Sequence, residues 1–368
     1  MSSSRTEGGS AAADAAPDES IGPAASSGDA ASFEPRPFVA GRWLGNGHVM
    51  TVFAWGRART FPALPPPEDR LFRVSPDSQV LGRCYWQPDR AGRPTLLALH
   101  GLEGSSDVRY MRGLAEKAWR RGWNAVLLNQ RNCGDTERLS PTLYHSGLTD
   151  DPRAVIRAIT AADGVRQVGV VGYSLGGNLA MKLAGELAAT PDVPVQAVAA
   201  VCPTIDLDRC VRAIERPINF PYQYHFVRNL KARMRRKARI WPDAFDLSAL
   251  DRIRSIRAFD DAYTAPSHGF GDAANYYQRA SAMRVVDRIA IPALILAADD
   301  DPFVPSSQFV EPAVRDNRSI RVIVSPHGGH CAFVARTRLG EDAFWAEATA
   351  VEFLASAFGG NEASPERR

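Results

Sequence analysis

The sequence predicts an α/β protein in which helices flank a mostly parallel sheet and a further helical segment is inserted between two strands. The main observation is that short apolar runs alternate with stretches of helical apolar spacing from about residue 94 onward. Strands separated by helices form βαβ units, whose strands run parallel. The longest nearly unbroken apolar run, residues 289–298, contains a proline and is much shorter than the roughly 18 residues of a membrane-spanning helix.

The expected elements follow one another regularly along the chain. Runs rich in Val, Leu, Ile and Ala predict strands at residues 94–99, 125–128, 168–171, 196–202, 293–296 and 321–324. Apolar residues recur at helical spacing after the first of these strands, at Met111, Leu114, Ala115, Ala118 and Trp119. The pattern predicts further helices at residues 178–188 and 342–358.

Composition divides the chain into a tail, one domain and an insertion. Ala, Ser, Gly and Pro fill 24 of the first 35 positions, so we expect residues 1–35 to be disordered, because they bury too little apolar surface. Residues 36–360 form the predicted domain, and residues 361–368 a flexible C-terminus. Between about residues 205 and 285 the strand–helix alternation stops, which predicts a helical lid over the sheet rather than an independent domain.

Charge and cysteine usage exclude several classes of protein. A net charge of +3 on 368 residues is too small to indicate a nucleic-acid-binding protein. The five cysteines are an odd number without a C-x-x-C pair, which argues against a disulfide framework and against a structural zinc site. The first 35 residues hold one basic residue, Arg5, and no apolar segment, so we expect no secretory signal and a cytoplasmic protein.

A candidate nucleophile lies directly after the third expected strand. Residues 172–176, G-Y-S-L-G, match the pattern G-x-S-x-G, and a helix is expected to follow. A sharp strand-to-helix turn requires small residues two places before and two places after Ser174, and it presents the hydroxyl at a helix N-terminus, where negative charge is favoured. The alternative is an ordinary glycine-rich turn capped by serine; the flanking pattern favours the nucleophile.

A serine hydroxyl needs a positioned base and an acid that orients this base. Three aspartates follow the strand at 293–296, and among them Asp301 fits an acid followed by x-x-Val-Pro; Asp300 is the alternative, and Asp299 is favoured as a loop residue. His330 is favoured over His327 as the base, because two glycines precede it on its loop. The other histidines lie either before the serine, at positions 48, 100 and 145, or in the insertion without an acid partner, at 225 and 268.

An oxyanion site needs two backbone N–H donors. The residue after the nucleophile, Leu175, is one expected donor. The other is Leu102, because residues 100–104, H-G-L-E-G, end the first expected strand and their glycines allow the backbone to turn inward.

Several segments resemble the α/β-hydrolase superfamily and, within it, the YheT-like branch of abhydrolase-domain esterases (the AB hydrolase 4 family). The resemblance runs from about residue 37 to 358. The segments are R-W-L-G-N-G-H at 42–48, H-G-L-E-G-S-S at 100–106, N-Q-R-N-C-G at 129–134, Y-H-S-G at 144–147, Asp260, residues 269–270 and 276–277, and G-G-H at 328–330. Two positions depart from the branch's usual glycine: Asn132, after Arg131, and Cys331, after His330.

The resemblance implies an α/β-hydrolase fold, with Ser174, Asp301 and His330 as a catalytic triad. It implies hydrolysis of short- to medium-chain carboxylic esters, including glycerol esters, on a small-molecule substrate and without a cofactor or metal. Some members of the branch instead transfer the acyl group to an alcohol or cleave phospholipids. The alternative functions here are therefore an acyltransferase that makes esters from an alcohol acceptor, or a lipase or phospholipase at a membrane surface. Cys331 could be a reactive thiol; a small packed residue is the favoured interpretation.

The small net charge conceals an uneven distribution. The segment 205–285 holds 15 basic and nine acidic residues, and six of the nine residues from 231 to 239 are basic. The simplest interpretation is a solvated helix face. The alternative is that this basic segment, including Arg235, Arg236 and Lys237, contacts anionic lipid surfaces or acidic substrates.

Overall fold

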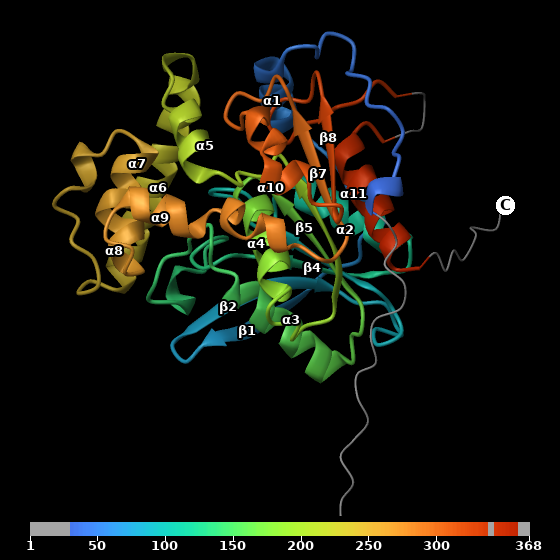
Figure 1. Cartoon of the computed structure of the whole chain (residues 1–368). Coiled ribbons are helices and arrows are strands. Elements are labelled where there is room, and N and C mark those ends of the chain that lie inside the picture. Colours follow the sequence, from blue (N-terminus) through green and yellow to red (C-terminus); the bar gives the residue numbers. More distant parts are fainter. Residues whose placement is uncertain (1–29, 338–341, 360–368) are drawn as a thin grey trace, which may run out of the picture.

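The computed structural model describes residues 30–337 and 342–359, and a single eight-stranded sheet lies at its centre. The strand order is β1-β2-β4-β3-β5-β6-β7-β8 (Figure 1). Only the β1–β2 and β2–β4 pairs are antiparallel, so the predicted mostly parallel sheet is confirmed. The strands are β1 (Glu68–Ser75), β2 (Ser78–Tyr85), β3 (Thr95–Leu99), β4 (Asn124–Leu128), β5 (Val168–Tyr173), β6 (Val195–Val201), β7 (Ala293–Ala298) and β8 (Ile320–Ser325).

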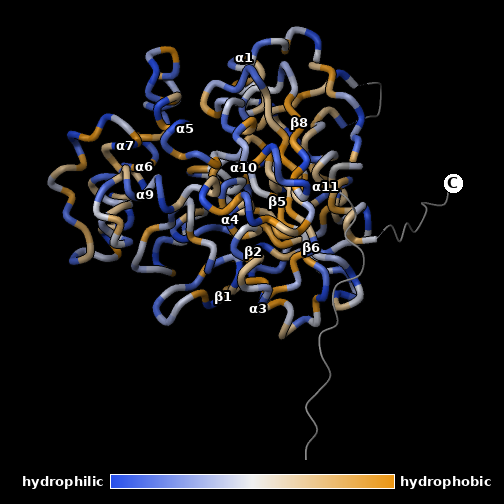
Figure 2. The backbone as a smooth tube through the Cα atoms, in the orientation of Figure 1, coloured by the Kyte–Doolittle hydropathy of each residue, from blue (hydrophilic) through white to orange (hydrophobic). Residues whose placement is uncertain are grey.

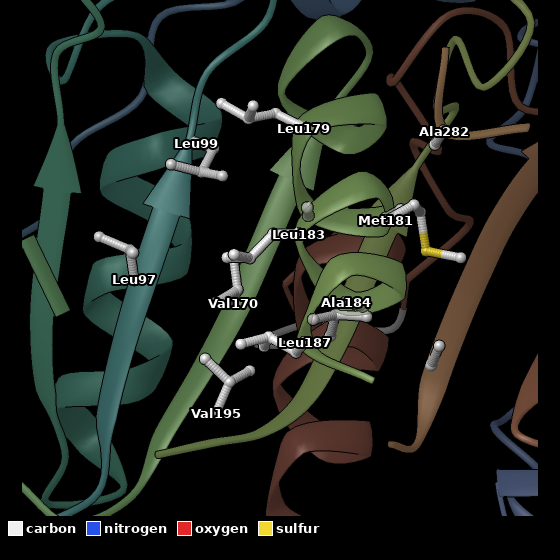
Figure 3. Packing of buried hydrophobic residues seen from close by; sticks show 14 of the residues in the cluster. Leu97, Leu99, Val170, Leu179, Met181, Leu183, Ala184, Leu187, Val195 and Ala282 are labelled. Atoms are coloured by element: carbon white, nitrogen blue, oxygen red, sulfur yellow. The ribbon is translucent and has the colours of Figure 1, made fainter. Parts of the chain in front are cut away.

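Helices cover both faces of the sheet because successive strand residues point to opposite sides. In β3, Leu97 and Leu99 join the core formed with α3 and α4, whereas Leu96 and Ala98 join the core formed with α2 and α11. Figure 3 shows the first of these cores, and in Figure 2 the hydrophobic colour concentrates on the central strands. The four helices are α2 (Arg109–Arg120), α3 (Asp150–Asp163), α4 (Leu175–Leu187) and α11 (Trp345–Ala357).

The segment between β6 and β7 is helical and has its own apolar core. Its helices are α5 (Leu207–Ile214), α6 (Phe220–Ile240), α7 (Ile256–Phe259), α8 (Ala265–Ser267) and α9 (Ala273–Ala280). Most of the buried side chains of this core belong to the segment itself, and Leu143 and Phe303 join them from the loops of the main domain. In Figure 1 these helices form a group beside the sheet. We call residues 205–285 the helical insertion.

Three elements in the first third of the chain were not expected from the sequence: α1 (Gly47–Gly56), β1 and β2. Strand β1 is largely exposed, and Phe72 is its only buried residue, so no alternating apolar pattern marks it. Helix α1 leaves Val49 and Val52 exposed and therefore lacks a clear apolar stripe. The remaining helix, α10 (Pro312–Arg315), is a single turn between β7 and β8.

The predicted boundary of the N-terminal tail needs a correction. Residues 1–29 and 360–368, and with them most of the two expected disordered ends, lie outside the described residues. The last part of the segment 1–35 is structured, because Ala30–Ser32 form a 3-10 helix and the Phe33 ring packs 5.2 Å from the Phe353 ring of α11. Among the described helices, none is long and apolar enough to span a bilayer.

Candidate active site

Ser174 occupies a strained turn between β5 and α4. Its backbone has φ 52° and ψ −114°, a conformation that costs a non-glycine residue on the order of 1–3 kcal/mol. A hydrogen bond from the Ser174 N–H to the Val201 carbonyl oxygen, at 2.9 Å, holds the turn against β6. The serine therefore stands at the carboxyl end of the sheet and at the N-terminus of α4.

The glycines of this turn are required by close packing. A Cβ atom at Gly172 would overlap the Gly176 carbonyl, and one at Gly176 would overlap the backbone of Leu99. Helix α4 thus approaches β3 and β5 more closely than any larger residue allows. It begins at Leu175, three residues earlier than the sequence suggested.

The loops after β7 and β8 bring Asp301 and His330 to this serine. The distance from His330 Nε2 to Ser174 Oγ is 2.9 Å, and that from His330 Nδ1 to Asp301 Oδ2 is also 2.9 Å. Asp301 Oδ1 accepts backbone hydrogen bonds from Phe303 and Val304, which fix the carboxylate. Serine, imidazole and carboxylate therefore form one continuous chain of polar contacts.

The neighbouring candidates have other contacts. Asp300 Oδ1 accepts a hydrogen bond from the Gly329 N–H at 2.8 Å, and its Oδ2 lies 3.3 Å from Nδ1 of the half-exposed His327. Asp299 is exposed, and its backbone N–H bonds to Ser325. Asp300 therefore binds the backbone of the loop after β8, which we call the histidine loop, and its side-chain polar contacts are with Gly329 and His327 rather than with the His330 ring.

Helix α1 supports the histidine loop from the opposite side. Thr51 Oγ1 accepts a hydrogen bond from the His330 N–H at 2.8 Å and donates one to the Gly47 carbonyl at 2.6 Å. Gly329 has φ 56°, and a Cβ atom there would crowd Gly47 and Thr51. No sequence signal identified Thr51, because its role depends on a contact 279 residues away along the chain.

The loop after β3 passes directly beside Ser174. A Cβ atom on Gly101 would lie 3.2 Å from the Ser174 Cβ, so Gly101 permits this approach. Leu102 and Leu175 both border the space next to Ser174, and neither N–H donates to another described residue. These two groups are therefore available to an oxygen atom bound there.

Buried polar side chains shape this loop from below. The His100 side chain is fully buried; its Nδ1 donates to the Gly101 carbonyl oxygen, and its Nε2 accepts the Gln130 N–H. Burial lowers the pKa of His100 to about 4, so the ring is neutral at physiological pH. Arg131 forms a two-point ion pair with buried Asp151 and thereby anchors the adjoining loop.

The Ser174 hydroxyl lies between two cavities. An apolar pocket, with about 790 Å³ of empty space, extends under the helical insertion. A more open and more polar outer cleft of about 1860 Å³ lies on the other side, where Arg59, Arg109 and Arg112 contribute to its wall. Leu102, Ser174 and His330 border both cavities. Two substituents of one bound molecule thus have separate spaces on either side of the serine.

Burial alone would lower the pKa of His330, but the Asp301 carboxylate and the neighbouring Cys331 outweigh it and raise that pKa. Cys331 borders the outer cleft, and fully buried Cys202, directly after β6, lies beside it. Burial opposes ionisation of Cys331, yet the hydrogen bond with Cys202 and the charge of His330 lower the pKa of Cys331 below the ordinary thiol value. Cys331 Sγ lies 3.5 Å from the Val201 carbonyl oxygen, which is a packing contact, and a reactive thiol at this position stays a prediction.

The basic run at 231–239 is not a uniform solvated face. The side chains of Arg233 and Lys237 are buried: Arg233 pairs with Glu103, and Lys237 donates to Asn132 Oδ1 at 2.6 Å. Arg236 is paired with Glu137 and Arg235 with Asp251. The interpretation of the run as one exposed charged surface is wrong, because much of its charge is used inside the protein; contact with anionic lipid stays a prediction.

The other histidines are held in structural contacts. His268 Nε2 donates to the Leu143 carbonyl oxygen, and its ring lies 4.4 Å from that of His145. His48 Nδ1 lies 3.1 Å from the Tyr222 hydroxyl and joins α1 to α6. His225 borders the outer cleft, where its Nε2 lies 3.0 Å from the Asn229 side chain. None of the four contacts the Ser174 hydroxyl.

Comparisons with known proteins bear on the fold and the family of this chain. The family model described as "alpha/beta hydrolase fold" matches residues 94–337. "Putative esterase YheT" of Escherichia coli K12 is 36% identical over 86% of this chain and 92% of its own. "Phospholipase ABHD3" of Mus musculus is 27% identical over 77% of this chain and 72% of its own. A crystal structure of 2,6-dihydroxy-pseudo-oxynicotine hydrolase, 20% identical, superposes with a TM-score of 0.56 over 84% of this chain and 73% of that one.

The structural likeness shows the fold, while the family model and the identity to YheT establish the family and its enzymatic character. The model covers well over half of the chain, and the relative at 36% identity is matched along nearly its whole length. The chain therefore belongs to the α/β-hydrolase fold family, in the branch that includes YheT, and it is an enzyme of the hydrolase class.

Proposed function

We propose that this protein is a serine carboxylic-ester hydrolase with Ser174 as nucleophile, His330 as general base and Asp301 as the acid that orients the imidazole. The single observation that supports it most strongly is the continuous contact chain from Ser174 Oγ through both His330 nitrogens to Asp301. This chain ends where two cavities meet, which is where a scissile bond has to lie.

In the proposed acylation step, His330 Nε2 removes the proton from Ser174 Oγ while this oxygen attacks the ester carbonyl carbon. The Leu102 and Leu175 N–H groups donate to the developing oxyanion, helped by the N-terminal end of α4. Asp301 stabilises the imidazolium that forms. The imidazolium then protonates the leaving alkoxide, which departs as the alcohol and leaves the acyl group on Ser174.

In the second step, His330 removes a proton from water, and the resulting hydroxide attacks the acyl-enzyme. The carboxylic acid leaves and Ser174 is regenerated with the proton from His330. We assign the acyl chain to the apolar pocket, because its wall is almost entirely apolar near helix α5, and the alcohol group to the outer cleft.

The names of relatives suggest which alcohol group to test. Beside the mouse phospholipase, "Monoacylglycerol lipase ABHD2" of Homo sapiens is 28% identical over 84% of this chain and 77% of its own. We therefore include glycerol esters among the proposed substrates. Arg59 is paired with Glu347, but Arg109 and Arg112 also border the outer cleft and carry N–H groups that can donate to a polar alcohol group.

The decisive test compares Ser174→Ala with Ser248→Ala, an exposed serine in a turn of the insertion. We expect Ser174→Ala to lose p-nitrophenyl butyrate turnover by several orders of magnitude and to lose labelling by a fluorophosphonate probe, while Ser248→Ala retains both. Full turnover in Ser174→Ala would refute the assignment. Adding an alcohol to the wild-type assay separates hydrolysis from the alternative of acyl transfer, because transfer yields a new ester in place of free acid.

The assignment of the acyl chain has its own test. Val211 of α5 borders the apolar pocket, so Val211→Trp should fill it and move the chain-length optimum toward shorter esters. An unchanged preference across a series of acyl chains would contradict that assignment while leaving the nucleophile in place.

A further inference from the structure

Three ligand-type side chains meet beside the candidate active site. Sγ of Cys202, Sγ of Cys331 and a ring nitrogen of His330 all lie within 4.8 Å of one another. Cys202 directly follows β6, whereas His330 and Cys331 belong to the loop after β8. The Cys331 N–H donates to Cys202 Sγ at 3.3 Å, so a backbone group of the loop after β8 is hydrogen-bonded to the Cys202 sulfur.

Two thiols and an imidazole are a donor set for thiophilic divalent cations such as Zn²⁺ and Cd²⁺. Zinc–sulfur bonds of about 2.3 Å and zinc–nitrogen bonds of about 2.0 Å place tetrahedral ligand atoms about 3.5–4 Å apart. The upper limit of 4.8 Å on the observed separations lies within about 1 Å of these values. Cys331 and His330 both border the outer cleft, which gives an ion a route to this cluster.

We propose that Cys202, His330 and Cys331 form a site for a thiophilic divalent cation, with zinc as the physiological class of ion. Binding converts both thiols to thiolates, so two protons leave to solvent, and the ring nitrogen supplies its lone pair. The sequence did not predict this site, because it has no C-x-x-C pair and the two cysteines come together only in the folded chain.

The consequence for catalysis rests on the proposed function. A neutral imidazole has a single lone pair, and the base role of His330 uses it to accept the Ser174 proton. A cation on either ring nitrogen occupies this lone pair and leaves none for the proton. Cation binding and ester hydrolysis therefore exclude each other, and the site makes the enzyme sensitive to free zinc.

The binding test uses Cd²⁺ with the reduced, full-length protein and follows the ultraviolet thiolate-to-metal charge-transfer band. We expect one equivalent to bind to the wild type, to Ser174→Ala and to Cys84→Ala, a control that removes another buried thiol. Cys202→Ala and Cys331→Ala should each weaken binding by more than about 100-fold, since loss of an indirect ligand partner alone typically costs 10–100-fold. An unchanged band in either variant would overturn the site.

The inhibition test measures p-nitrophenyl butyrate turnover with and without Zn²⁺ within each variant. We expect inhibition that a chelator reverses in the wild type and in Cys84→Ala, and none at the same concentration in Cys331→Ala. Equal inhibition of Cys331→Ala would refute the link between site and catalysis. Because Ser174→Ala reports binding without activity, failure of the metal site and failure of the esterase proposal are distinguishable.

Discussion

The Arg233 guanidinium on helix α6 lies 2.5 Å from the Glu103 carboxylate, and both side chains are almost completely buried. Glu103 directly follows Leu102, and its backbone adopts a left-handed conformation with φ 58°. The Arg233 guanidinium also stacks over the Tyr144 ring, whose hydroxyl accepts the Glu103 N–H. The helical insertion is therefore tied to the loop that carries a proposed oxyanion donor.

Removing one partner of this pair should lower stability and turnover together. We expect Glu103→Ala or Arg233→Ala to lose about 3–5 kcal/mol of unfolding free energy, because each leaves a buried charge unpaired. The double variant should lose less than the sum of the single losses. Urea unfolding and kcat for a butyrate ester test this, with exposed Arg239→Ala as control. Additive losses would show that the two charges do not interact.

Substitutions of the adjacent residues Asp300 and Asp301 should reduce kcat to very different extents. Asp301→Asn is expected to reduce kcat by about 10⁴-fold, as loss of the orienting carboxylate does in serine hydrolases with this arrangement. Asp300→Asn keeps an oxygen that can accept the Gly329 N–H and should cost far less. Measuring kcat and the melting temperature of both variants tests the assignment. A larger kcat loss for Asp300→Asn would reverse it.

Adding one methyl group to the turn that carries Ser174 should strongly reduce folding stability. Gly176→Ala forces a Cβ atom into the backbone of Leu99, so we expect insoluble protein or a loss of more than about 3 kcal/mol. Gly56→Ala at the end of α1 meets no atom within 4 Å and provides the matched control. Soluble expression and chemical unfolding distinguish the two. Wild-type stability in Gly176→Ala would mean that helix α4 can move away from β3.

Asp260 should make folding stability depend on pH. Burial raises the pKa of this carboxyl group to about 6, from an ordinary value of 3.8. The folded protein therefore holds this proton more tightly than the unfolded chain, and stability should fall as pH rises from about 4 to 6. The expected loss is about 3 kcal/mol, at about 1.4 kcal/mol for each pKa unit.

The measurement compares wild type with Asp260→Asn by urea unfolding at pH 4.5 and pH 7.5. The unfolding free energy of Asp260→Asn, relative to that of the wild type, should be higher at pH 7.5 than at pH 4.5. Tyr277→Phe, which removes the hydrogen bond to Asp260 Oδ2, should retain or enlarge the pH dependence of the wild type. A constant difference would show that Asp260 ionises normally in the folded state.

The main sheet and the serine turn were predictable because they depend on local pattern. The strands near Ser174 are continuous apolar runs, and the spacing of Gly172 and Gly176 is itself the signal of a sharp turn. The meeting of Asp301 and His330 beside Ser174 was predictable, since the loops after parallel strands meet at one edge of a sheet, while their catalytic roles stay a prediction. The x-x-Val-Pro pattern favoured Asp301 over Asp300, and of the two it is the Asp301 carboxylate that contacts the His330 ring.

Features that depend on distant contacts could not be predicted in this way. Thr51 has no chemical signature, and its importance comes from one hydrogen bond to the His330 backbone. The basic run looked like an exposed surface because sequence alone does not show its buried partners. In the fold, Arg233 of α6 pairs with Glu103, and Lys237 donates to Asn132. Cys202 and Cys331 stand 129 residues apart, and each appears ordinary in isolation.

The support that helix α1 gives to the histidine loop sets a lower limit on the size of a working fragment. The family model begins at residue 94, and a fragment cut there would keep every residue that we assign to the chemistry. It would lose Thr51 and the backbone of Gly47, against which the loop of His330 is packed. We therefore expect the smallest active fragment to begin before residue 94, where the family match starts. Truncation within α1, or a tag inserted there, should abolish activity although every residue assigned to the chemistry is still present.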